Sequence, residues 1–272
     1  MDKVWLVTGA SRGFGRVWAT AALERGDRVA LAARNPDAVR DLVEAHPGRA
    51  LAVRLDVTDR DRVFVAVQEV VDAFGRIDVV ANNAGFGHFG MVEEATEQEV
   101  RDQFEANVFG ALWVTQAVLP VMRAQRSGHL LQTSSRMGVM AVPNLGIYNA
   151  SKFALEAFSD SLAREVRDFG IKVTLIEPQG YATDWSGSSA HRSAKNPAYD
   201  DLRAWLAEHP TTVPPGQPEA TGPVVLEIVD MEEPPLRVLF GSGAVERVAS
   251  VYADRLRTWQ ETRELTERAD HL

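Results

Sequence analysis

The feature that most constrains the fold is a regular alternation of short apolar runs, rich in β-branched residues, with longer stretches of helical periodicity. The short runs cover residues 4–7, 28–32, 50–55, 77–81, 129–132 and 172–176. The helical stretches cover residues 17–25, 60–74, 97–123 and 147–169. A parallel pair of strands needs a crossover connection, which is usually a helix. The order therefore predicts an α/β fold with a doubly wound parallel sheet and helices on both faces.

The whole chain, residues 1–272, is expected to form a single domain, because its composition is near ordinary globular usage. Several helical stretches end at a glycine, as expected where a helix stops in a left-handed residue. These glycines are Gly26, Gly75 and Gly170. The alternation breaks at residues 178–216, which are rich in Gly, Ser, Pro and Trp. A helix over residues 219–229, a strand over residues 236–240 and a charged last helix close the chain.

Composition narrows the class of protein. The net charge of -9 comes without a basic block, which argues against nucleic acid and anionic membrane surfaces as partners. The chain has no cysteine, so disulfides, thiol catalysis and thiolate metal sites are excluded, and its six histidines are scattered, so no metal site is expected. No signal sequence or membrane span is evident. We expect a soluble cytoplasmic protein.

A glycine-rich loop follows the first apolar run directly and precedes a helical stretch. Glycines let the backbone turn sharply and approach a pyrophosphate, and the helix start offers free N–H donors. The alternative is a tight glycine turn without a ligand, but the strand, turn and helix context favours dinucleotide binding. The expected contacts are Gly9, Ser11, Arg12, Gly13, Phe14 and Gly15.

The end of the second strand indicates which dinucleotide is bound. An acidic residue there would accept a hydrogen bond from the ribose 2′-hydroxyl of NAD, but the chain has Ala33 and Arg34. The Arg34 guanidinium would instead pair with a 2′-phosphate, and Arg12 could reach the same group. The alternative is that both arginines are solvated surface charges. NADP(H) is favoured over NAD(H).

Tyr148 and Lys152 lie four residues apart at the start of a predicted helix, so one stands above the other on the same face. With this pair added to the glycine loop, the sequence resembles the short-chain dehydrogenase/reductase family, which has a Rossmann fold. The resemblance extends over nearly the whole chain. Further matching residues are Asp56, Val57, Asn82, Asn83, Ala84, Gly85, Asn107, Ser135, Pro178, Gly180 and Thr183.

The resemblance implies a role for each matching segment. Asp56 and Val57 would contact the adenine, and Asn83, Ala84 and Gly85 would line the cofactor cleft. Asn82 and Asn83 could also be turn-forming residues after the fourth strand. By the same resemblance, Pro178, Gly180 and Thr183 would border the nicotinamide, with Thr183 bonding its amide. Asn107 would help to hold Lys152 in a proton relay, and Lys152 would also bond the nicotinamide ribose.

The chemistry can also be argued from the residues. Reduction of a ketone needs hydride at carbon and a proton at oxygen, and a tyrosine with an ordinary pKa near ~10 is a slow acid-base group at neutral pH. A nearby Lys152 ammonium, together with the charged ring of the oxidised cofactor, would favour the Tyr148 phenolate. Ser135 could hold the substrate oxygen, with Ser134 as the alternative. A half-buried tyrosine beside a solvated lysine is the structural alternative.

The substrate pocket is expected near the carboxyl ends of the strands, under a covering loop at about residues 180–216. The family commonly has Pro-Gly where this chain has Pro178 and Gln179, so Gln179 is predicted either to contact a polar group in the site or to point outward. The pocket candidates are Phe86, His88, Phe89, Met137, Met140, Leu145, Tyr181 and Trp185. About half of them are expected to be packing only, and His88 is expected to be solvated.

The leading hypothesis is an NADP(H)-dependent enzyme that interconverts a hydrophobic ketone and a secondary alcohol, with Tyr148 as the acid/base. By analogy with the family, the long helices over residues 97–123 and 147–169 would form the interface of a homodimer or homotetramer. A second hypothesis is a cofactor-sensing binding protein without turnover, and a third is a lyase or dehalogenase on the same fold. Both are disfavoured because the tyrosine, the lysine and the glycine loop are all present.

Overall fold

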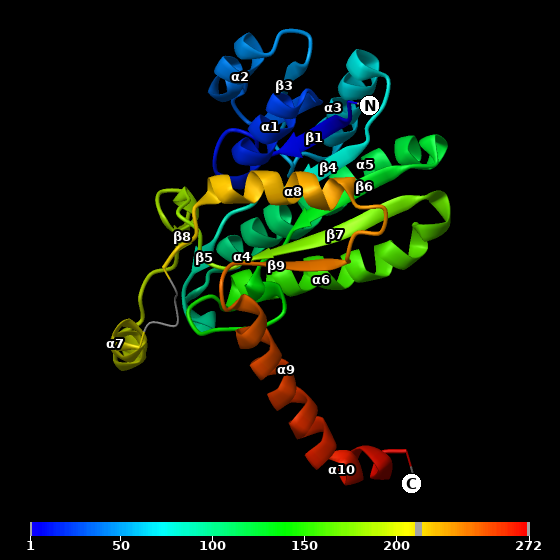
Figure 1. Cartoon of the computed structure of the whole chain (residues 1–272). Helices are drawn as coiled ribbons and strands as arrows, with labels where there is room; N and C mark the ends of the chain where they lie inside the picture. The colour runs from blue at the N-terminus through cyan, green and yellow to red at the C-terminus, as the bar shows by residue number, and fades with distance from the viewer. Residues whose placement is uncertain (1, 210–213, 271–272) are drawn as a thin grey trace.

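A seven-stranded sheet lies at the centre of the part of the chain that the computed structural model describes, residues 2–209 and 214–270 (Figure 1). Its order is β3-β2-β1-β4-β6-β7-β9, and every neighbouring pair is parallel. The strands are β1 (Val4–Thr8), β2 (Arg28–Ala33), β3 (Ala50–Arg54), β4 (Val79–Asn82), β6 (Gly128–Thr133), β7 (Ile171–Pro178) and β9 (Arg237–Phe240). The predicted doubly wound α/β class is confirmed.

Two apolar cores cover the two faces of the sheet. Successive residues of β1 alternate between them, because side chains of a strand point to opposite faces. Trp5 and Val7 enter one core, and Val4 and Leu6 enter the other. The first core is closed by α1 (Gly13–Arg25), α2 (Arg40–Ala45) and α8 (Thr221–Asp230). The second is closed by α3 (Arg60–Phe74), α5 (Gly110–Gln125) and α6 (Gly146–Glu165).

The predicted glycine helix ends are found in the structure. Gly26 and Gly75 adopt left-handed conformations directly after α1 and α3. Gly170 does the same after the short 3₁₀ turn Arg167–Phe169 that follows α6. A residue with a Cβ is strained in this conformation, so glycine ends each helix sharply.

The helical stretch predicted over residues 97–123 is interrupted in the structure. α4 (Glu97–Phe104) runs into a π-helical turn, Glu105–Phe109, before α5 begins. A π turn inserts an extra residue and redirects the side chains that follow, and such turns occur often at functional sites. Here the turn carries Asn107, whose side chain is buried.

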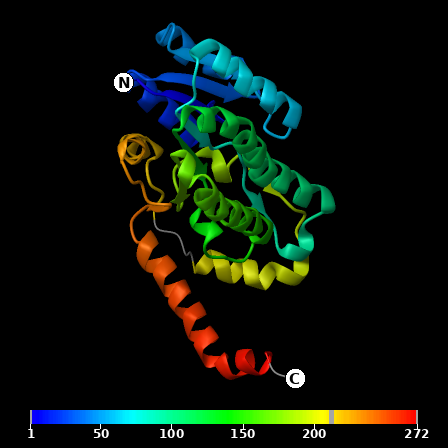
Figure 2. The same cartoon turned by 90° about the vertical axis from the view of Figure 1, so that its right-hand side faces the viewer.

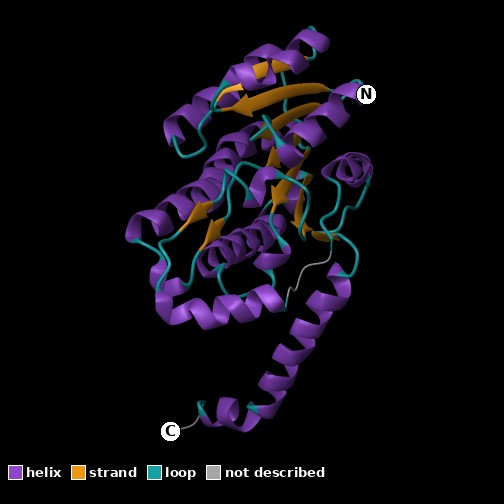
Figure 3. Ribbon diagram, turned by 90° about the vertical axis from the view of Figure 1, so that its left-hand side faces the viewer, coloured by secondary structure: helices purple, strands orange, loops and turns teal. Residues whose placement is uncertain are grey.

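The region predicted to be irregular, residues 178–216, contains regular elements. β8 (His191–Arg192) pairs in parallel with β5 (His88–Phe89) in a small sheet separate from the central one (Figure 3). A helix, α7 (Asp200–Glu208), follows. Residues 184–209 are called the lid segment below. Because β5 follows β4 closely, this pairing attaches the lid segment to the carboxyl edge of the sheet.

The charged C-terminal helices, α9 (Ala244–Glu261) and α10 (Arg263–Arg268), extend away from the sheet (Figures 1 and 2). The first half of α9 still contacts the rest of the protein, where Val248 and Val251 pack against the cluster of Met137, Met140 and Tyr148. Arg255 Nη1 donates to the Val139 carbonyl at 3.2 Å. None of the helices in the described ranges combines the length and apolar character that crossing a bilayer requires.

Candidate active site

The glycine loop fits the pyrophosphate of a dinucleotide. Gly9 and Gly13 have φ values of 66° and 55°, so the loop uses backbone conformations that favour glycine. α1 begins at Gly13, and no side chain caps it and no acid stands in its first turn. The N–H groups of that turn are therefore not occupied by a side-chain cap, and with the positive end of the helix dipole they form a site for an anion.

Asn83 joins the loop after β4 to the glycine loop after β1. Its backbone N–H and that of Ala84 both donate to the Thr8 hydroxyl, at 2.9 and 3.0 Å. Its side-chain Nδ2 donates to the Thr8 carbonyl at 3.1 Å. β1 and β4 are neighbours in the sheet, so these bonds fix two walls of one crevice. Asn83 is thus more than a turn-forming residue.

The groups predicted to read the adenosine half lie at the ends of β2 and β3. Arg34 is exposed directly after β2, and none of the described carboxylates forms an ion pair with it. Arg12 instead bonds Asp184 of the lid segment at 3.2 Å. Asp56 Oδ1 accepts two hydrogen bonds from Thr58. Arg34 is thus an exposed cation at the end of β2, while Arg12 joins the glycine loop to the lid segment.

Tyr148 and Lys152 lie on the first turns of α6 and are both buried. Lys152 Nζ donates to the Thr133 carbonyl at 2.8 Å and lies 5.8 Å from the centre of the Tyr148 ring. Ser135 Oγ accepts from the Met137 N–H at 3.1 Å, and it is close enough to Tyr148 to lower the pKa of that phenol in part. Ser134 points elsewhere, because its Oγ lies next to Gly138. Of the two serines, Ser135 is the one positioned with Tyr148.

Burial dominates the ionisation of this pair. It raises the pKa of Tyr148 to about 12, and Ser135 opposes that effect only in part. It lowers the pKa of Lys152 to about 8. The sequence predicted that Lys152 would stabilise a Tyr148 phenolate. Without a bound cofactor, burial has the larger effect on the pKa of Tyr148. At neutral pH the phenol holds its proton, and Lys152 is close to the point at which it loses its charge.

Asn107 reaches the site through its neighbours. Its Oδ1 accepts from the Phe86 N–H at 3.1 Å, and its Nδ2 donates to the Phe86 carbonyl at 3.1 Å and to Ser151 Oγ at 3.3 Å. Ser151 directly precedes Lys152. The described contacts of Asn107 thus fix the chain after β4 and the turn of α6 that carries Lys152. Its part in a proton relay stays a prediction.

An apolar cluster surrounds Tyr148. The Trp185 ring stands edge-on to the Tyr148 ring at 5.0 Å between centres, and it also contacts Phe89 at 5.2 Å. The buried members are Met137, Met140 and Tyr148, with Val142, Leu145, Trp185, Val248 and Val251 packed against them. Sequence reasoning missed Val248 and Val251, because α9 shows only an amphipathic pattern and no motif that ties it to the site.

Two predicted substrate residues, Tyr181 and Phe86, do not join this cluster, and Gln179 follows one of its two predicted alternatives. Tyr181 packs edge-on against Phe14 at 5.0 Å, within the core that contains α1, and does not join the cluster around Tyr148. The Phe86 ring lies 4.3 Å from that of His191. Gln179 donates to the Ser242 carbonyl at 3.3 Å. Of the two alternatives for Gln179, the structure thus supports the side chain that points away from the site, into the turn before α9.

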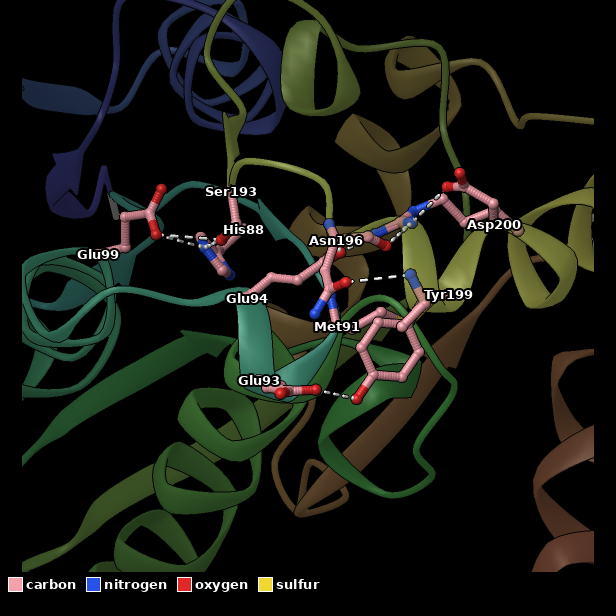
Figure 4. A network of polar contacts seen from close by, with 11 residues as sticks. His88, Met91, Glu93, Glu94, Glu99, Ser193, Asn196, Tyr199 and Asp200 are labelled. Carbon is pink, nitrogen blue, oxygen red and sulfur yellow. Dashed lines mark hydrogen bonds and ion pairs between the residues drawn. The ribbon is translucent and has the colours of Figure 1, made fainter.

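His88 is fully buried, so the prediction of a solvated histidine is wrong. Its Nε2 lies 3.0 Å from Ser193 Oγ, which donates to Glu99 Oε2 at 3.0 Å (Figure 4). The pairing of β5 with β8 carries His88 beneath the lid segment and removes it from water. Burial lowers the pKa of His88, so the ring is neutral and structural.

The same network holds the far end of the lid segment (Figure 4). Glu94 forms an ion pair with Arg203 and accepts from the Asn196 N–H at 2.6 Å. The Tyr199 hydroxyl donates to Glu93 at 2.6 Å. The Arg203 guanidinium lowers the pKa of Glu94 to about 2, so this contact stays charged. The lid segment is therefore attached along much of its length while Trp185 covers Tyr148.

This fold and site are those of a nucleotide-dependent oxidoreductase. Residues 3–194 match the family model of the short chain dehydrogenases, and the chain belongs to that family. It is 40% identical to an oxidoreductase of Botryotinia fuckeliana, BOA17, over 96% of this chain and 98% of the relative. It is 36% identical to a 3-ketodihydrosphingosine reductase of Bacteroides thetaiotaomicron over 88% of each chain. The crystal structure of a short-chain dehydrogenase from Streptomyces avermitilis superposes with a TM-score of 0.91, at 40% identity and 98% coverage of both chains.

Proposed function

We propose that the chain is an NADP(H)-dependent reductase that interconverts a hydrophobic ketone and a secondary alcohol, with Tyr148 as the acid/base. The observation that carries the proposal is the buried group of Ser135, Tyr148 and Lys152, in a chain that also has the glycine loop after β1. These groups lie beyond the carboxyl ends of parallel strands, where doubly wound folds bind their ligands. Cytoplasmic location and a homo-oligomer remain part of the proposal.

Each residue has a role in reduction. Tyr148 keeps its proton at neutral pH because burial raises its pKa, so its hydroxyl can donate that proton to a carbonyl oxygen. Ser135 holds the same oxygen as negative charge develops there. The Lys152 ammonium compensates the charge that remains on Tyr148 after donation. A nicotinamide cofactor supplies the hydride when bound.

The cofactor would be held by the glycine loop, with Arg34 beside the adenosine ribose. The exposed Arg34 and the absence of an acid at the end of β2 favour a 2′-phosphate, since a carboxylate there would repel it. Asp56, Val57, Ala84, Gly85, Pro178, Gly180 and Thr183 complete the proposed contacts. Thr183 lies across from the loop, because a Cβ added to Gly13 would stand 3.8 Å from its Cγ2.

The substrate is proposed to be a bulky apolar ketone. The wall around Tyr148 is made of methionine, valine, leucine and tryptophan side chains, which match apolar groups and offer few hydrogen bonds. The Bacteroides relative is named as a reductase of a keto compound, which agrees with this class. Met137, Met140, Leu145 and Trp185 are the proposed contacts, and Val248 and Val251 are added from α9.

The test is oxidation of NADPH and of NADH with a panel of aliphatic, aryl and steroidal ketones, for the parent and for Tyr148→Phe. We expect the parent to oxidise NADPH faster, and Tyr148→Phe to bind NADPH as the parent does but lose turnover by about 100-fold or more. Undiminished turnover by Tyr148→Phe would refute its role. Tight NADPH binding without turnover on any ketone would instead favour the cofactor-sensing protein.

A further inference from the structure

Two carboxyl groups are buried directly below the catalytic lysine. Glu156 lies one turn after Lys152 on α6, and Glu177 lies near the end of β7. Their exposed fractions are 5% and 2%. Carboxylates are rarely buried without compensating charge, and the chemistry assigned to Ser135, Tyr148 and Lys152 uses neither of them directly.

One guanidinium serves this pair. Arg237 Nε, from β9, donates to Glu156 Oε2 at 2.9 Å and lies 3.7 Å from Glu177 Oε1. Arg237 Nη2 donates outward to Asp160 at 2.9 Å. The Oε1 atoms of both buried glutamates have no hydrogen-bond donor among the described residues. Asp160 also pairs with Arg164 at 3.0 Å, so Arg237 is the cation that the two buried glutamates share.

A shared proton resolves this excess of acid. Burial, and then the neighbouring Glu156, raise the pKa of Glu177 to about 8. At neutral pH the pair therefore carries a single proton. One negative charge is left on the pair, and Arg237 contacts it at Glu156 Oε2.

That negative charge acts on Lys152. The Nζ group donates to the Thr133 carbonyl at 2.8 Å and lies 5.8 Å from the centre of the Tyr148 ring. Glu156 stands four residues farther along α6, on the same face of the helix. Burial lowers the pKa of Lys152, and Glu156 is the charge that opposes this effect. Arg237 and Glu177 approach from β9 and β7, and they act through Glu156. Without the Glu156 charge, Lys152 would lose its proton at a lower pH.

We propose that Glu156 is a positioning residue that acts through Lys152: its carboxylate keeps Lys152 in the ammonium form that supports proton transfer at Tyr148, while Glu177 and Arg237 keep Glu156 a single anion. This inference rests on the proposed function of Tyr148 and Lys152. It differs from a structural role, in which the Arg237 bridge would only join β9 to α6. A structural role affects stability but leaves the ionisation of Lys152 unchanged.

The direct test measures the pKa of Lys152 without turnover. The sequence has only four lysines, so protein labelled with ¹³C-lysine gives few signals, and Lys152→Arg identifies that of Lys152. We expect Glu156→Gln to lower the pKa of Lys152 by about one unit or more, as loss of a close opposite charge does. Asp160→Asn is the matched control. It removes another acceptor of Arg237 one turn farther away, and should leave the Lys152 pKa within a few tenths of a unit of the parent's, roughly the limit of such titrations.

A second variant keeps the test usable if Glu156→Gln does not fold, which thermal unfolding would reveal. Glu156→Asp retains the charge but withdraws it by one methylene group, so the pKa of Lys152 should fall by less than in Glu156→Gln. Glu177→Gln replaces a protonated acid by a neutral group of the same shape and should leave that pKa near the parent value. An unchanged Lys152 pKa in Glu156→Gln, or in Glu156→Asp where that is the folded variant, would overturn the proposal.

Kinetics separates this inference from the proposed function. If Lys152 works as an ammonium, the alkaline limb of the pH profile for ketone reduction should move to lower pH in Glu156→Gln by the same amount as the measured pKa. Asp160→Asn should keep the parent limb. A lowered pKa without NADPH oxidation on any ketone would refute the proposed function and leave the linkage standing. Tyr148-dependent turnover with an unmoved alkaline limb would refute the linkage alone.

Discussion

Substitution of Gly15 by alanine should weaken binding of the dinucleotide through overcrowding. A Cβ added at Gly15 would lie 2.5 Å from the Gly9 carbonyl oxygen and 2.5 Å from Asn83 Nδ2. The first contact is with backbone, which cannot rotate away, so the glycine loop or the start of α1 must shift. Overpacking of this kind costs about 1–3 kcal/mol. Expressed in binding, this is a rise of roughly 5- to 150-fold in the Kd of NADPH.

The assay is NADPH titration by fluorescence together with thermal unfolding. Gly48→Ala is the control, because a Cβ there meets nothing within 4 Å and Gly48, in the turn before β3, is not one of the proposed cofactor contacts. Its φ of 76° makes alanine strained, so this variant controls for lost stability, and its Kd should stay within about twofold of the parent. If Gly15→Ala binds NADPH as tightly as Gly48→Ala, the close approach of the two loops does not shape the site.

Two further predictions concern the lid segment and the sheet. Glu94→Gln weakens the contact with Arg203, so limited proteolysis within the lid segment should become several-fold faster. The control is Glu97→Gln, which loses only its exposed ion pair with Arg101. Equal rates of proteolysis in the two variants would contradict the attachment of the lid segment. Burial in β6 lowers the pKa of His129 to about 3, so acid protonates His129 first in the unfolded chain and stability falls as pH drops below about 6.5. This contribution should approach about 1.4 kcal/mol of unfolding free energy per pH unit. Urea unfolding at pH 7 and at pH 4 measures it, and His129→Gln should lose less stability between these two pH values than the parent. Equal losses in the two proteins would disprove the prediction.

The parts of the site that the sequence predicted are those written in local patterns. Two examples are the glycine loop between a strand and a helix, and the tyrosine and lysine one turn apart. Their local geometry does not depend on how distant segments pack. The π turn at Asn107 lacks such a pattern, because the alternation of apolar residues continues through it. His88 was expected in water for the same reason, since its burial depends on a partner strand at His191, about a hundred residues later.

Contacts between distant segments account for the remaining differences. Val248 and Val251 reach the pocket only because β9 returns the chain to the edge of the sheet before α9 begins. Tyr181 is only a few residues from Trp185, yet it turns toward Phe14 because the lid segment begins between them. Tyr181 and Trp185 were predicted to line the pocket on the same evidence, their residue type and their place in the sequence. Only the packing shows that Trp185 contacts Tyr148 and that Tyr181 does not join the cluster around it.

The wall around Tyr148 has a consequence for how such a protein diversifies. The groups proposed for the nucleotide and for proton transfer belong to the first 183 residues, whereas Trp185, Val248 and Val251 arrive from segments that the sheet does not need for its own core. Substrate selectivity should therefore be transferable between relatives. A chimera that takes its lid segment and α9 from a relative should have the donor's preference among ketones, and it should keep the recipient's nucleotide preference and the stereochemical course of its reaction.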